Sequence, residues 1–243
     1  MSVLLMQLSG PLQAWGGPAQ LRDWSTQMLP TFSGVLGIVA AAQGRSRQDD
    51  LSDLTALRFG VRADRPGMML VDLQTTQPAP GQRVPGLGDE YANQASLLAR
   101  KGYVADAVFL AALEGDAVLI DRAATALQHP HWLPVLGRRG CAPDRPVFVS
   151  STQDDLLCAL RGHAWIGRRR QNEQQPEKAL LAHTDAQGDV RMQDVPLSWT
   201  SKARRYGYRL VRQEFVRLPS APGEHDLPSA PGEHEPLSLL EGA

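Results

Sequence analysis

The order of strands and helices expected over residues 3–150 constrains the fold more than any other feature of the chain. An apolar run predicts a strand at Val3–Leu8, and a second apolar run predicts a helix at Val35–Ala42 with Thr31 or Ser33 as its N-cap. Further strands and one amphipathic helix are expected, in chain order, at Arg58–Asp64, Met68–Gln74, Ala105–Glu114, Ala117–Gln128 (the helix) and Val147–Ser150. The order strand, helix, strand, strand, helix, strand predicts an α+β fold with a ferredoxin-like sheet.

Three further segments complete the organisation that we expect. Residues 75–103 are rich in Pro and Gly and lack a sustained period, which is typical of a long functional or disordered insertion. The turn Arg65-Pro66-Gly67 favours a hairpin between the two strands that flank it. Residues 151–217 are expected to extend the main domain, residues 1–150, as a smaller strand-rich part. Residues 218–243 repeat the octapeptide LPSAPGEH and are expected to form a disordered tail.

Charge is unevenly distributed along a chain whose formal net charge is only −1. Residues 161–217 carry 12 Lys and Arg against 6 Asp and Glu, a net +6, whereas residues 218–243 carry five acids and no base. A basic C-terminal third suits a polyanionic partner, although local swings of this size also arise by chance. No apolar run approaches the ~20 residues that cross a bilayer, and two cysteines suit a reducing compartment. We therefore expect a cytoplasmic protein without a membrane partner.

The loop after the first strand, Ser9–Gly16, is the first candidate for ligand binding. Gly10 and Gly16 allow the backbone to approach a ligand closely, and the Gln13 amide can both donate and accept hydrogen bonds. Trp15 offers a face on which an unpaired base could stack. The alternative is that Trp15 anchors the core and the glycines only turn the chain, which residue chemistry alone favours.

Two basic clusters are the next candidates. Arg138 and Arg139 lie in a loop bounded by glycines, where planar guanidinium groups suit phosphate contacts. Lys202, Arg204 and Arg205 interleave with tyrosines, an arrangement that can bind backbone and bases together. The alternative for the first cluster is a pair of solvated charges, one of them in a salt bridge, and the alternative for the second is an ordinary amphipathic edge strand.

Residues for catalysis are few, and we predict no catalytic residue, no metal site and no cofactor. The chain has no Gly-rich phosphate loop ending in Lys-Ser/Thr, no Gly-x-Ser-x-Gly and no His-Glu-x-x-His. Metal-independent RNA cleavage would need a histidine near a tyrosine or lysine. His163, His183, Tyr206 and Lys202 supply these types, but their spacing does not select them.

The ordered motifs of the chain resemble a known family. They are Leu8–Gly16, Pro30–Gly37, Arg58–Arg62, Tyr103–Phe109 and Leu136–Cys141. In this order they closely resemble the CasD family, the five-type Cas subunits of the type I-E CRISPR Cascade complex. The resemblance covers residues 1 to about 217 and leaves only the duplicated tail outside it.

The resemblance implies a fold, a role and partners. Members of this RAMP superfamily have a ferredoxin-like, RRM-related domain with a projecting thumb, which would be residues 75–103 here. They are non-catalytic subunits in antiviral defence that bind the 5′ handle of the CRISPR RNA and cap one end of the backbone filament. A related five-type branch processes its own precursor RNA, so a metal-independent endoribonuclease is kept as the alternative function. Their partners are the backbone and large subunits of Cascade, and target DNA is met only through the complex, where the guide RNA reads it.

Carried over by position, the resemblance places Ser9–Gly16, Thr31, Ser33, Arg138 and Arg139 at the RNA handle, with Lys202–Arg209 as a weaker candidate. The chain also departs from the family pattern. Phe32 stands where a basic residue is usual, and residues 20–29 contain Arg22 as their only arginine. These differences indicate that aromatic stacking, or the basic C-terminal residues, replaces phosphate contacts in this region.

Overall fold

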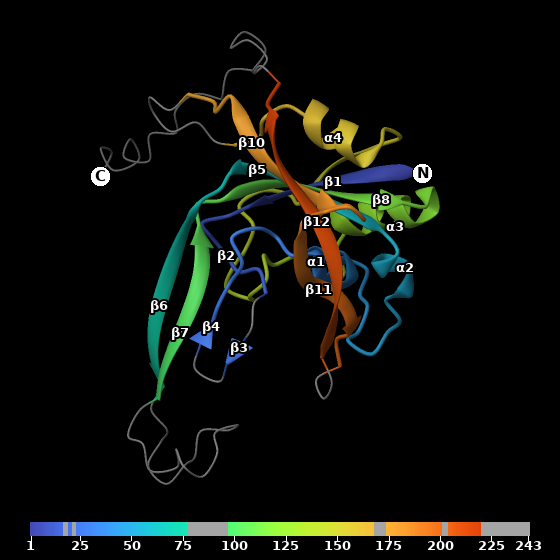
Figure 1. Cartoon of the computed structure of the whole chain (residues 1–243). Helices are drawn as coiled ribbons and strands as arrows, with labels where there is room; N and C mark the ends of the chain where they lie inside the picture. Colours follow the sequence, from blue (N-terminus) through green and yellow to red (C-terminus); the bar gives the residue numbers. More distant parts are fainter. Residues whose placement is uncertain (17–18, 21–22, 77–96, 168–173, 201–203, 220–243) are drawn as a thin grey trace, which may run out of the picture.

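The computed structural model describes residues 1–16, 19–20, 23–76, 97–167, 174–200 and 204–219. The largest unit of the described chain is a seven-stranded antiparallel sheet with helices on both faces (Figure 1). Its strand order is β11-β12-β10-β5-β8-β1-β9. The strands are, in chain order, β1 (Ser2–Ser9), β5 (Arg58–Arg65), β8 (Val108–Gly115), β9 (Phe148–Thr152), β10 (Lys178–Thr184), β11 (Val190–Ser198) and β12 (Arg205–Arg217).

A second, smaller sheet forms an arm that projects from the main one (Figure 1). Its long antiparallel pair is β6 and β7, and β7 also pairs with the short strands β2 and β4. The strands of this sheet are β2 (Leu12–Gln13), β3 (Ala19–Gln20), β4 (Asp23–Trp24), β6 (Met68–Thr76) and β7 (Leu97–Ala105). The expected thumb, residues 75–103, therefore begins and ends in β6 and β7, and its residues 77–96 lie outside the described part.

Helices cover the two faces of the main sheet unequally. The chain has α1 (Phe32–Ala42), α2 (Ser52–Thr55), α3 (Ala117–Gln128) and α4 (Leu156–Gly162). Leu4, Met6 and Leu8 of β1 pack in one apolar cluster with residues of α1 and α3, whereas Val3 and Leu5 pack in another with residues of α4. Strand β1 is therefore buried on both faces, which explains why its sequence is mostly apolar instead of alternating.

Most of the expected elements of residues 1–150 are present. Helix α1 begins after Thr31, whose hydroxyl accepts a hydrogen bond from the backbone N–H of Gly34, so Thr31 is the N-cap. The amphipathic helix at Ala117–Gln128 is confirmed, with Asp116 as its N-cap. A mixed α/β fold built mostly of antiparallel strands is thus confirmed.

Two expectations about strand pairing were wrong. The strands on either side of the 65–67 turn form as predicted, but β5 pairs with β8 and β10, and β6 pairs with β7. They therefore lie in different sheets and make no hairpin with one another. The turn residue Gly67 has a φ of +71° and turns the chain from one sheet into the other. The second error concerns Leu97–Ala105, most of which we assigned to an irregular insertion although it forms β7.

Candidate nucleic-acid interface

The loop Ser9–Gly16 and the loop that carries Arg138 and Arg139 are joined through their backbones. The N–H of Ala14 donates to the carbonyl oxygen of Leu136 over 2.9 Å. Gly137 has a φ of +93°, and a Cβ there would lie 1.6 Å from the carbonyl oxygen of Ala14. A Cβ on Gly10 would lie 2.7 Å from the carbonyl oxygen of Ala142. These glycines thus allow close contact between two segments of the same chain.

Gln13 and Trp15 face the interior and not the surface. Both side chains are completely buried. The Gln13 amide nitrogen donates to the carbonyl oxygens of Leu8 and Ala107, and its oxygen accepts from Trp15 Nε1 over 3.1 Å. All the polar atoms of the two side chains are therefore satisfied within the protein. This geometry suits residues that position the loop and leaves neither side chain exposed to a ligand.

The Trp15 ring packs against the first turn of α1. A Cβ on Gly34 would lie 2.9 Å from Trp15 Cε3, so only glycine fits over the ring without displacement. Gly16 is exposed beside this turn, and Ser33, which precedes Gly34 in the chain, is half-buried. The predicted residues Trp15, Gly16, Thr31 and Ser33 thus meet at one place, the N-terminal end of α1.

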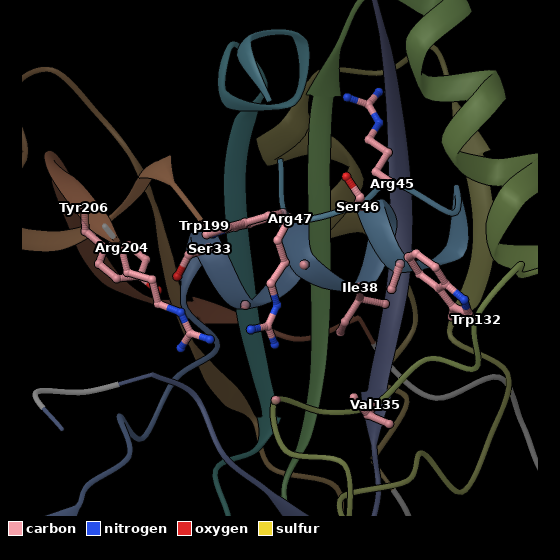
Figure 2. Close-up of a pocket in the computed structure, with 15 residues that line it drawn as sticks. Ser33, Ile38, Arg45, Ser46, Arg47, Trp132, Val135, Trp199, Arg204 and Tyr206 are labelled. Carbon is pink, nitrogen blue, oxygen red and sulfur yellow. The ribbon is translucent and has the colours of Figure 1, made fainter. Parts of the chain in front are cut away.

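A groove of about 390 Å³ lies over the outer face of α1 (Figure 2). Helix α1 contributes a floor of small residues, and a Cβ on Gly37 would meet no atom within 4 Å. Three aromatic residues from distant segments contribute walls. The floor is made by Gly34, Gly37, Ala40 and Ala41 together with the larger Ile38, and the aromatic wall residues are Trp132, Trp199 and Tyr206.

Two arginines give the groove its positive charge. Arg47 and Arg204 are exposed, and within the described residues neither makes a hydrogen bond or an ion pair. Their guanidinium groups lie on the same side of α1, whereas Arg45 points the other way (Figure 2). Two guanidinium groups over an open floor suit phosphate groups, because each offers a planar set of donors.

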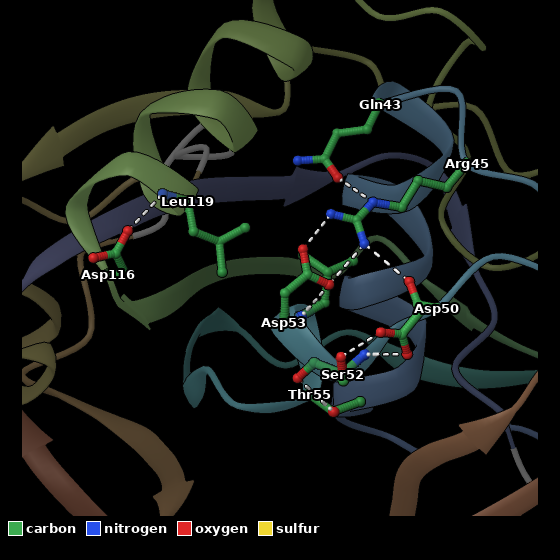
Figure 3. A network of polar contacts seen from close by, with 9 residues as sticks. Gln43, Arg45, Asp50, Ser52, Asp53, Thr55, Asp116 and Leu119 are labelled. Carbon is green, nitrogen blue, oxygen red and sulfur yellow. Dashed lines mark hydrogen bonds and ion pairs between the residues drawn. The ribbon is translucent and has the colours of Figure 1, made fainter.

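Arg45 lines the same groove, but its charge is paired with the carboxylate of Asp53. Its guanidinium group donates to both carboxylate oxygens of Asp53, over 2.7 and 2.5 Å, and to the side chain of Gln43 (Figure 3). The hydrogen bonds that Arg45 donates to Asp53 raise the pKa of Arg45 and lower the pKa of Asp53. The positive field of the groove is therefore centred at Arg47 and Arg204.

The remaining predicted residues lie outside the groove or outside the described residues. Arg138 is half-buried and donates to the carbonyl oxygens of Gly102 and Trp24 over 2.9 and 2.7 Å, so its guanidinium group anchors the arm. Arg139 and Arg205 are exposed. Lys202 lies outside the described residues. Of the predicted set, Ser33 and Arg204 line the groove directly.

Several groove residues were missed by sequence reasoning. Arg47, Trp132 and Trp199 come from three segments that only the fold brings together, and Arg47 alone looks like any solvated charge. The small residues of α1 carried a usable sequence pattern, because Gly34, Gly37 and Ala41 recur three and four residues apart. That spacing predicts one bare helix face.

The described residues contain no group of three or more His, Cys, Asp or Glu side chains that could hold a metal ion. Nor does any helix in the described part of the chain have the length and apolar character to span a membrane. The fold and the groove together define an α/β protein with a basic, aromatic-lined surface that suits a polyanion with unpaired bases.

Comparison with known proteins agrees with this description. Residues 3–212 match the family described as CRISPR-associated protein (Cas_Cas5). The chain is 31% identical over 201 residues to the CRISPR system Cascade subunit CasD of Escherichia coli (strain K12), which covers 78% of this chain and 80% of that protein.

Two solved structures are also similar. A crystal structure of a Cas protein has a TM-score of 0.71 at 33% identity and covers 90% of this chain and 99% of that one. A chain of a CRISPR RNA-guided surveillance complex has a TM-score of 0.72 at 32% identity and covers 91% and 95%. The chain therefore belongs to the CasD/Cas5 family of CRISPR-associated proteins, which confirms the family that its motifs predict.

Proposed function

We propose that this chain is a non-catalytic subunit of a type I-E Cascade complex, in antiviral defence, and that it binds the 5′ handle of the CRISPR RNA. The groove over α1 carries this proposal. It combines two exposed guanidinium groups, at Arg47 and Arg204, with a floor on which Gly37 leaves open space. The similarity to CasD and to a chain of an RNA-guided surveillance complex supports the same role.

The groove suits an RNA strand with unpaired bases. Arg47 and Arg204 can contact phosphates, while Trp132, Trp199 and Tyr206 offer ring faces for stacking, each base contributing ~1–3 kcal/mol in single-strand binders. A backbone can approach α1 closely at Gly34 and Gly37, which have no side chains. Gly10, Gln13 and Trp15 then act beneath the site as positioning residues, and Gly16, Arg139 and Arg205 are proposed as further contacts at its edge.

The finer fold assignment is part of the proposal. The elements β1-α1-β5-β8-α3-β9 follow the ferredoxin-like order, with antiparallel neighbours β5-β8-β1-β9 and both α1 and α3 packed in one cluster. We assign residues 1–150 to this RRM-related RAMP domain and the β6–β7 arm to its thumb. Residues 151–217 supply β10, β11 and β12, which extend the sheet beyond β5. The tail predicted at residues 218–243 lies outside the described residues from residue 220 on, whereas Leu218 is buried and its N–H donates to the carbonyl oxygen of Glu177.

The protein partners are proposed from the family and from one surface. Both strands of the arm expose large apolar side chains, with Met68, Val71 and Leu73 each 58–60% exposed. Apolar side chains gathered on a projecting arm suit contact with another protein. We assign the backbone and large subunits of Cascade as partners, and place the chain at one end of the backbone filament. Target DNA would be met through the assembled complex, in the cytoplasm.

The non-catalytic assignment is supported by the groove's composition. None of its described lining residues is a histidine, and His183 is buried in β10. A metal-independent nuclease would need such a group beside the scissile phosphate. Incubating the purified chain with labelled repeat RNA and EDTA separates the two functions. We expect intact RNA, and specific cleavage would establish the endoribonuclease instead.

Binding of guide RNA to the purified chain, followed over a range of salt concentrations, tests the groove. Replacing both Arg47 and Arg204 by Ala should lower affinity and reduce the slope of log K against log salt by about 1.4, at ~0.7 for each phosphate contact. Arg217→Ala is the matched control, since Arg217 is an exposed arginine at the far end of β12. An unchanged slope in the double variant would refute the groove as the RNA site.

A further inference from the structure

A buried ion pair joins the C-terminal hairpin to the start of α1. Arg209 of β12 donates through Nε and Nη2 to the two carboxylate oxygens of Asp194 of β11, over 2.7 and 2.9 Å. The two side chains are 8% and 4% exposed. Arg209 also donates to Thr184 Oγ1 of β10 over 3.1 Å. A bidentate pair of this kind holds both partners in one geometry.

The same carboxylate reaches the first residue of α1. Asp194 Oδ2 accepts a hydrogen bond from the backbone N–H of Phe32 over 2.8 Å, across 162 residues of sequence. The first turn of α1 contains no acidic residue of its own, so Asp194 supplies the negative charge that a helix N-terminus favours. The Arg209 guanidinium carbon lies 5.7 Å from the ring of Phe32 and 5.0 Å from that of Phe59.

Alternation along β11 places Asp194 on the buried face of the strand. Arg191 and Gln193 are exposed, whereas Asp194 and Pro196 are buried. The register with β12 shifts between Met192 and Val195, so Asp194 lies at an irregularity of the ladder.

The hairpin continues from this pair directly into the groove wall. Beyond Asp194, β11 leads to Trp199, and β12 begins at Arg205, next to Arg204 and Tyr206. The floor of the groove is α1 itself. The pair thus connects the element that makes the floor to the hairpin that carries one wall.

We infer that Asp194 and Arg209 are positioning residues for RNA binding, because they hold the wall of Trp199, Arg204 and Tyr206 at a fixed distance from α1. This inference rests on the proposed function of the groove. Neither side chain touches the ligand. Loss of the pair would free the wall to move, so Arg204 would no longer be held where a phosphate on the floor could meet it.

The lost charge and the lost positioning predict opposite effects of Asp194→Asn on the affinity for RNA, which makes the variant informative. Removing an acid near a basic groove should strengthen the binding of a polyanion if charge alone matters. Positioning predicts weaker binding, by about 5-fold, an effect within the range of residues that couple through a shared structure. Binding of guide RNA equal to or tighter than that of the unmodified chain would overturn the inference.

A double-mutant cycle tests the coupling directly. Arg204→Ala should weaken RNA binding about 5-fold in the unmodified chain but less than about 2-fold in the Asp194→Asn background, because the contact is already lost there. Asp64→Asn is the matched control, since Asp64 and Arg62 form a fully buried pair on the face of the sheet that packs against α4. Equal costs of Arg204→Ala in both backgrounds would overturn the inference. If Asp194→Asn does not fold, Asp194→Asn with Arg209→Gln leaves no unpaired buried charge and takes its place in the cycle.

Amide hydrogen exchange separates this inference from the proposed function. Asp194→Asn should accelerate exchange at residues 32–35 and 205–207, and Asp64→Asn should not. If Arg204→Ala has no effect in the unmodified chain, the proposed role of Arg204 fails, and exchange still decides whether the pair holds the wall. Unchanged exchange in both segments would overturn the positioning role.

Discussion

Replacing Gly34 or Gly37 of α1 by alanine should have opposite effects on the stability of the protein. A Cβ on Gly34 would lie 2.9 Å from Trp15 Cε3 and 3.0 Å from Thr31 Oγ1, whereas a Cβ on Gly37 would meet nothing within 4 Å. Alanine in a helix interior is favoured over glycine by ~0.5–1 kcal/mol. Gly37→Ala should therefore raise the free energy of unfolding by about that amount.

Gly34→Ala gains the same preference but also crowds a ring that cannot move, because Trp15 is completely buried. Overpacking of this kind costs ~1–3 kcal/mol, so the variant should be less stable than the unmodified chain by up to about 2 kcal/mol. The Thr31 hydroxyl, which accepts from the N–H of Gly34, is crowded as well. The difference between the two variants isolates this cost.

Urea unfolding of the two variants measures the difference. For an m-value of about 2 kcal/mol/M, the midpoints of Gly34→Ala and Gly37→Ala should differ by about 0.5–1.5 M, with Gly34→Ala the lower. Equal midpoints would refute the placement of Trp15 beneath α1. Gly37→Leu extends the test to function, because it would fill the groove floor. It should weaken RNA binding while the protein remains folded.

Three further predictions concern residues away from the groove floor. Arg138→Ala should lower the melting temperature because it frees the arm, whereas Arg139→Ala should leave melting unchanged and flatten the salt dependence of RNA binding; the reverse pattern would contradict these roles. The ion pair with Arg45 lowers the pKa of Asp53, so the pair stabilises the fold above about pH 4 and this stabilisation is lost as pH falls below that value. The urea midpoint of Asp53→Asn should therefore depend less on pH between 5 and 3 than that of the unmodified chain. Parallel curves for the two proteins would contradict the pair. Deleting residues 220–243 should leave assembly on guide RNA intact, and lost assembly would show that the tail is a docking element.

Elements with local causes could be predicted from sequence. Helix α3 has an apolar period, an aspartate N-cap at Asp116 and a proline after its end at Pro130. Strand β1 was predicted from a short apolar run, and its burial on both faces accounts for the missing alternation. In both cases the residues that determine the element lie within it or beside it.

Pairing and burial depend on distant residues, and there sequence reasoning was limited. The turn Arg65-Pro66-Gly67 predicted a hairpin between β5 and β6. Strand β5 pairs with β8 instead, which nothing near the turn indicates. Trp15 could not be assigned to core or ligand, because Gly34, nineteen residues later, decides that its ring is covered. Asp194 gave no sequence indication that it would reach Phe32. The groove likewise draws on segments that are far apart in the chain.

Crosslinking of guide RNA to this chain within its assembled complex tests the central claim most directly. Aromatic residues in contact with bases should crosslink on irradiation, and the attached peptides can be identified by mass spectrometry. The groove predicts crosslinks at Trp199, Tyr206 or Trp132 and none at Trp15. Crosslinks at Trp15, with none at the three groove residues, would contradict the groove as the site that binds the RNA handle.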